Sequence, residues 1–124
     1  MKKIEMVVEK TNTGYSAYSS QFAVCTTGGD MVELKSNILE ALNLYFSEEE
    51  RIITEEDFRI IIDLPQFFDF YKVINAKAFS QRIGMNQSLL AQYIKGIKKP
   101  STTQTERILQ GVQQLGRELA EIQF

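Results

Sequence analysis

Side chains that can pair with nucleic acid bases recur at helical spacing between residues 86 and 95. Ser88, Ala91, Gln92 and Lys95 follow one another at intervals of three, one and three residues, which places them on one face of a helix. Amides and hydroxyls can donate to and accept from base edges, whereas a carboxylate would repel phosphate and is absent from this face. We therefore predict that this face contacts the major groove of duplex DNA.

The segment 75–101 contains the elements that would hold this face in place. Asn75 is suited to cap a first helix, which ends at Gly84 because glycine readily adopts the left-handed backbone of a tight turn. Apolar Met85 then faces the core, and a second helix starts at Asn86. The spacing resembles the helix-turn-helix of phage-repressor-type regulators, with an ordinary helical hairpin as the alternative.

The residues predicted to contact DNA lie at the start of the second helix, on its outer face and in the basic loop that follows. They are Asn86, Gln87, Ser88, Ala91, Gln92, Lys95, Lys98, Lys99 and Ser101. A glutamine such as Gln92 can pair with adenine through both amide atoms. The lysines at the far end of the helix and in the loop should meet the sugar-phosphate backbone instead.

The last helix carries an apolar seam. Ser101 and Gln104 have the spacing of a capping box. Apolar residues then alternate at intervals of four and three, as in a coiled coil: Ile108, Val112, Leu115, Leu119 and Ile122. We expect the early members to complete the helical core, and Leu115, Leu119 and Ile122 to form the contact of a homodimer or of a higher even oligomer. The alternative is that this helix folds back on the N-terminal domain.

Composition narrows the possible functions. The 124 residues, 44% of them hydrophobic, suffice for one packed domain or two very small ones. There is no histidine, and Cys25 is the single cysteine, so we expect no ordinary zinc site, no internal disulfide, no cofactor and a buried, unreactive thiol. The sequence has no apolar run of signal-peptide or membrane-spanning length, which predicts a cytoplasmic protein.

Charge differs between the two halves of the chain. Residues 1–63 hold six Lys or Arg against twelve Asp or Glu, whereas residues 64–124 hold eight against four. This asymmetry suggests an acidic module for one partner and a basic module for nucleic acid, although solvated faces can also differ in charge by chance.

The acidic half predicts a small α+β domain. Alternation and turn residues indicate antiparallel strands over residues 2–10, 15–18 and 22–26. From residue 31 the apolar period becomes helical, with Asp30 as the cap, and the apolar run 58–62 suits a buried strand. The expected fold class is therefore α+β: a sheet of three to four strands with one helix, followed by an all-α helix-turn-helix domain.

Several segments of this half are similar to the HicB antitoxin family. They are Tyr15-Ser16-Ala17, Cys25-Thr26-Thr27-Gly28-Gly29-Asp30, and Glu33, Asn37, Glu40 and Ala41. The resemblance implies a truncated RNase H-like domain over residues 1–63 that binds a toxin, and a DNA-binding domain over residues 64–124. It also implies a partner, a small basic HicA-like ribonuclease, which an acidic module suits electrostatically.

An RNase H-like sheet also raises a nuclease hypothesis, because that chemistry needs carboxylates that converge on metal ions. The candidates are Glu5, Glu9, Asp30, Glu33 and Asp63, but they form no spaced motif, so we expect no catalytic residue.

The aromatics Phe67, Phe68, Phe70 and Tyr71 could stack on single-stranded bases, but we expect them to pack beneath the helix-turn-helix. The favoured function is an autorepressing antitoxin; the main alternative is a free-standing repressor whose N-terminal domain senses a ligand or dimerises.

Overall fold

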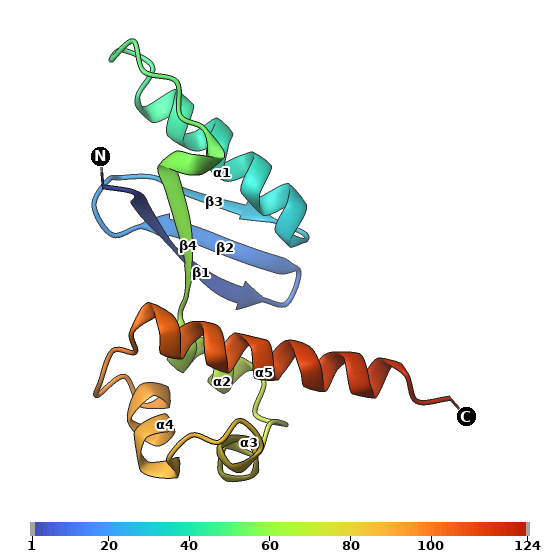
Figure 1. Ribbon diagram of the computed structural model, residues 1–124. Helices are drawn as coiled ribbons and strands as arrows, with labels where there is room; N and C mark the ends of the chain where they lie inside the picture. The colour runs from blue at the N-terminus through green and yellow to red at the C-terminus, as the bar shows by residue number, and fades with distance from the viewer. Residues whose placement is uncertain (1, 124) are drawn as a thin grey trace. The chain divides into compact units, whose positions relative to one another are not determined.

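The chain folds into two units, and the computed structural model describes residues 2–123 of it. The first unit, Met1–Phe70, contains a sheet and helices, and the second, Tyr71–Phe124, contains helices only (Figure 1). The predicted α+β class, a small sheet followed by a helical region, is confirmed.

The sheet has four strands in the order β3-β2-β1-β4. The strands β1 (Ile4–Thr11), β2 (Gly14–Ser19) and β3 (Cys25–Gly28) form the predicted antiparallel meander, and β4 (Phe58–Ile62) pairs with β1 in parallel. The third strand starts three residues later than expected. The hydroxyl of Ser19 accepts the amide hydrogens of Gln21 and Phe22. These hydrogen bonds form a local turn that includes residues otherwise suited to a strand.

Helix α1 (Met31–Tyr45) covers one face of the sheet (Figure 1). As predicted, Asp30 caps it, with Oδ1 accepting the amide hydrogen of Glu33 at 2.8 Å. The helix buries Leu34, Ile38 and Leu42 completely. The core they share with the sheet also includes Ile4, Met6, Val8, Ala17, Val24 and Phe58.

Two burial predictions for the sheet are wrong. Strand β4 lies at an edge of the sheet, and Phe58 alone of its five residues is buried, because only one of its faces meets the core. Cys25 is exposed rather than buried. It pairs with the exposed Tyr18, and successive residues of a strand point to opposite faces, so its neighbour Val24 enters the core instead.

The predicted boundary between the halves also shifts. We expected residues 64–70 to pack with the helical domain, but α2 (Leu64–Phe70) belongs to the first unit. Asp63 accepts the amide hydrogen of Gln66 at its start. The side-chain amide of Gln66 then accepts from the Lys10 amide at 2.9 Å and donates to the Lys10 carbonyl at 2.7 Å. This pair of hydrogen bonds fixes α2 to β1. Elsewhere in the first unit, a short 3-10 turn, η1 (Glu55–Asp57), precedes β4.

The second unit consists of three helices, α3 (Ala76–Arg82), α4 (Gln87–Ile94) and α5 (Thr102–Ala120). Its buried side chains are Phe79, Ser80, Met85, Leu90, Tyr93 and Ile108. The small Ser80 is buried inside the unit, and its hydroxyl donates to the Lys77 carbonyl at 2.6 Å.

Candidate nucleic-acid interface

The turn between α3 and α4 has the geometry that the sequence predicts. Asn75 caps α3, accepting the amide hydrogen of Ala78 at 2.9 Å. Gly84 has a φ of +67°, in the left-handed region, and Met85 is buried, with its amide donating to the Ser80 carbonyl at 2.9 Å. The direction in which α4 leaves the turn is therefore fixed by backbone as well as by core contacts.

Helix α4 presents the predicted polar face to solvent. Leu90 and Tyr93 are buried, whereas Gln87, Ser88, Gln92 and Lys95 are exposed and Ala91 is half-buried. Among residues 2–123, the side chains of Gln87, Ser88 and Gln92 make no hydrogen bond to the protein. Their donors and acceptors are thus available to a ligand.

Asn86 is among the predicted DNA contacts, but its role as a helix cap limits the hydrogen bonds that it can make to a base. Its Oδ1 accepts the amide hydrogens of Ser88 at 2.9 Å and Leu89 at 3.2 Å, so it caps α4. A bidentate pairing with adenine needs both the oxygen and the amino group of the amide. Asn86 can offer a ligand its amino group only.

The loop after α4 holds two lysines at the surface. Gly96 adopts a φ of +73°, and the Gln92 carbonyl accepts the amide hydrogens of Ile97 at 3.0 Å and Lys98 at 3.3 Å. Lys98 and Lys99 are exposed beyond this closed turn. Ser101, also predicted to contact DNA, caps α5 by accepting the amide hydrogen of Gln104 at 3.2 Å.

Helix α5 braces α3 and the turn through residues that the sequence analysis did not single out. Arg107 donates to the carbonyls of Ile83, at 3.0 Å, and Gly84, at 2.7 Å. A Cβ atom on Gly111 would lie 2.4 Å from Cγ2 of Ile83 and 3.1 Å from Cζ of Phe79, so this glycine allows α5 to lie close against α3. An isolated glycine inside an amphipathic helix was the available signal.

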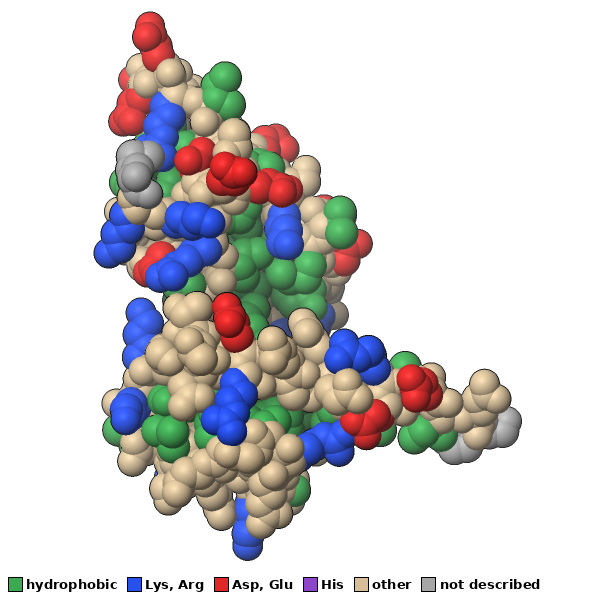
Figure 2. All heavy atoms as spheres, in the orientation of Figure 1, with side chains coloured by type: hydrophobic (Ala, Val, Ile, Leu, Met, Phe, Trp, Pro, Cys, Tyr) green, Lys and Arg blue, Asp and Glu red, His purple; other side chains and the backbone are tan. Residues whose placement is uncertain are grey.

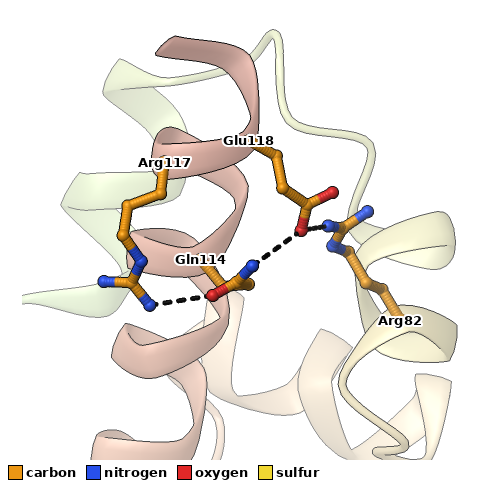
Figure 3. A network of polar contacts seen from close by, with 4 residues as sticks. All are labelled: Arg82, Gln114, Arg117 and Glu118. Atoms are coloured by element: carbon orange, nitrogen blue, oxygen red, sulfur yellow. Dashed lines mark hydrogen bonds and ion pairs between the residues drawn. The ribbon is translucent and has the colours of Figure 1, made fainter. Parts of the chain in front are cut away.

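Farther along α5, a polar network joins its last turns to the end of α3 (Figure 3). Arg82 forms an ion pair with Glu118, Gln114 donates to the same carboxylate at 3.2 Å, and Arg117 donates to Gln114 at 2.9 Å. The hydrogen bonds from Arg82 and Gln114 lower the pKa of Glu118 below its ordinary value.

The predicted dimer contact forms an incompletely covered seam on α5. Leu115 is half-buried, whereas Leu119 is 58% exposed and Ile122 is 54% exposed. Gly116 lies beside them, and a Cβ atom built on it would meet nothing within 4 Å. The seam is therefore apolar and accessible in the isolated chain.

Four of the five carboxylates named in the nuclease hypothesis have other partners. Glu5 pairs with Arg59, Asp30 caps α1, Glu33 accepts the Gly29 amide hydrogen and Asp63 caps α2. Within residues 2–123, no three Asp, Glu, Cys or His side chains are grouped so as to hold a metal ion.

Acidic and basic side chains are distributed unevenly. Figure 2 shows Asp and Glu gathered around the end of α1 and the loop that follows it, whereas none appears over α3 and α4 on the face in view.

No family model, characterised protein or solved structure matches the chain. Over the part of the chain that is described, no helix is both long and apolar enough to span a bilayer.

Proposed function

We propose that this chain is a DNA-binding antitoxin that acts in the cytoplasm. In this proposal, the helical unit binds operator DNA and the sheet unit covers a small basic ribonuclease toxin. The observation that carries the DNA-binding part is the outer face of α4, where the side chains of Gln87, Ser88 and Gln92 are exposed and make no hydrogen bond within residues 2–123. Amide and hydroxyl groups on a helix of this kind are suited to base edges in a major groove.

The surroundings of α4 support the same proposal. Lys95, Lys98 and Lys99 are exposed at the end of the helix and in the loop beyond it, where a protein that inserts a helix into the groove meets phosphates. Residues 71–124 hold eight Lys or Arg against three Asp or Glu. A homodimer through the α5 seam would supply two such helices, one for each half of a symmetric operator.

The toxin-binding part draws on the resemblance of the first half to HicB antitoxins. Charge is its second support, because residues 1–70 hold six Lys or Arg against thirteen Asp or Glu. An acidic surface attracts a basic protein and accelerates their association. Inhibition would then follow from covering the surface of the toxin that acts on RNA.

Co-expression tests the toxin-binding part. The full chain, tagged, should retain the product of a short neighbouring reading frame that encodes a small basic protein, and should abolish growth arrest by that product. The Gln92→Ala variant serves as the matched control, since it alters the DNA face and should retain the partner equally well. If the neighbouring product neither arrests growth nor binds, the free-standing repressor becomes the better account.

A further inference from the structure

We infer that α4 reads A·T base pairs through Gln87, Ala91 and Gln92, and that no side chain on its reading face selects guanine or cytosine. This inference rests on the proposed DNA-binding function and specifies the class of DNA sequence that the site takes. It follows from which side chains on this unit are available to bases and which are already engaged within the protein.

The available side chains match adenine and thymine. Gln87 and Gln92 are exposed, and their side-chain amides make no hydrogen bond within residues 2–123. A glutamine amide pairs with adenine by accepting from N6 and donating to N7. Ala91 precedes Gln92 on the same face, and its methyl group is of the kind that packs on the C5 methyl of thymine.

The side chains that usually contact guanine are held elsewhere. Arginine is the commonest reader of guanine, and the helical unit has three: Arg82, Arg107 and Arg117. Arg82 pairs with Glu118 and Arg117 donates to Gln114 (Figure 3), while Arg107 donates to two carbonyls of the α3–α4 turn. Each guanidinium is therefore engaged with α5 or the turn.

This surface also lacks the carboxylate that selects cytosine. The N4 amino group of cytosine is typically read by a carboxylate, and the sequence contains no Asp or Glu from residue 70 to residue 105. Lys95 can contact guanine in principle, but it is the C-cap residue of α4, at the end remote from Gln87. The reading face thus carries two glutamine amides and a methyl group that match adenine and thymine, a Ser88 hydroxyl that can pair with any base, and no arginine or carboxylate that selects guanine or cytosine.

The test selects duplexes from a library with about twenty random base pairs, enough for two half-sites one helical turn apart, using the full chain. Base analogues then scan the selected duplex. Replacing adenine by 7-deazaadenine, which lacks the N7 acceptor, should weaken binding by about 5- to 150-fold at positions that Gln87 or Gln92 contacts. Replacing thymine by uracil, which lacks the methyl group, should weaken binding by about fourfold at a position that Ala91 contacts.

Variants assign these effects to residues. Gln92→Ala should lose sensitivity to 7-deazaadenine at one position, and Ala91→Gly should lose sensitivity to uracil. Gln92→Arg should shift the selected base at the Gln92 position from adenine to guanine. Arg82→Ala is the matched control and should select the same sequences as the unaltered chain, because its guanidinium contacts Glu118.

The outcomes separate this inference from the proposed function. If the chain retains no library duplex above the level of a scrambled control, the DNA-binding function itself fails. If it selects a defined sequence whose sensitive positions respond to 7-deazaguanine and not to 7-deazaadenine or uracil, DNA binding stands and the A·T assignment is overturned. The analogue scan uses the unaltered chain, so it decides the question even where a variant does not fold.

Discussion

Two glycines of α5 have opposite surroundings, and substitution by alanine should distinguish them. A Cβ atom on Gly111 would lie 2.4 Å from Ile83, a β-branched side chain with little freedom to move, whereas Gly116 has open space around it. Gly111→Ala should lower the free energy of unfolding of the helical unit by about 1 to 3 kcal/mol through overpacking. Gly116→Ala should raise it by about 0.5 to 1 kcal/mol, the helix propensity gained.

Hydrogen exchange of the α3 and α5 amides would measure both effects in the full chain, because these amides lie in the helical unit and report on its opening. Equal effects of the two substitutions would contradict the close packing of α3 and α5 at Gly111.

The ion pair of Glu118 gives the helical unit an acid-sensitive contact. The folded-state pKa of Glu118 is lower than its ordinary value of 4.5. The contact therefore contributes stability fully above about pH 4.5 and loses it as the pH falls through the lower folded-state value. Glu118→Gln should be less stable than the unaltered chain near neutral pH, with a difference that shrinks at more acid pH.

Stability measured across this pH range for both chains would test the contact. Glu121→Gln provides the control on the same helix, as Glu121 makes no side-chain hydrogen bond or ion pair within residues 2–123. If the difference in stability between Glu118→Gln and the unaltered chain is independent of pH, the carboxylate charge of Glu118 does not contribute to the stability of the helical unit.

At the scale of elements, the α5 seam should govern dimerisation. Leu119 and Ile122 are each more than half exposed, so aspartate is tolerated in the monomer, but a dimer through the seam would bury two unpaired charges per chain. Leu119→Asp with Ile122→Asp should therefore give a monomer that binds operator DNA weakly, because each half-site is read by one helix.

Sedimentation of the full chain would detect the change. Val32→Asp with Leu44→Asp is the matched control, since these α1 side chains are also strongly exposed and apolar, at 82% and 75%. An unchanged oligomer in the seam variant would exclude this helix as the dimer contact.

Local signals in the sequence were sufficient for most elements. Asp30, Asn75 and Ser101 each cap the helix that they were predicted to cap, because capping depends on residues three apart in the chain. Periodicity likewise identified α1 and the face of α4. Two features that the sequence patterns did not identify depend on contacts between distant residues. The exposure of Cys25 is set by the pairing of its strand, and the role of Arg107 is set by carbonyls more than twenty residues away in the chain.

The position of α2 illustrates the same limit. Its proline and aromatic residues predicted a short helix correctly, but a helix can pack against either neighbour. The side-chain amide of Gln66, bonded to Lys10 across 56 positions of sequence, fixes α2 to the sheet unit. No pattern within the segment itself indicates that pairing.

At the scale of the whole molecule, opposite charges are divided between the two units. Residues 1–70 carry a net charge of −7 and residues 71–124 a net charge of +5, giving the chain total of −2. A chain that is acidic overall would repel DNA at long range, so binding should depend on the short-range contacts of α4 and on the lysines of the loop after it. These two kinds of contact should respond differently to substitution.

The most direct measurement is a titration of the full chain with the duplex upstream of its gene and with a scrambled duplex, at several salt concentrations. Gln92→Ala should cost about 1 to 3 kcal/mol on the upstream duplex and little on the scrambled one, because it removes a base contact. Lys98→Ala with Lys99→Ala should weaken both duplexes alike and reduce the logarithmic salt dependence by about one unit for each phosphate that is no longer neutralised. An unchanged ratio of the two affinities in Gln92→Ala, with an altered ratio in the lysine variant, would contradict the assignment of α4 as the helix that reads DNA.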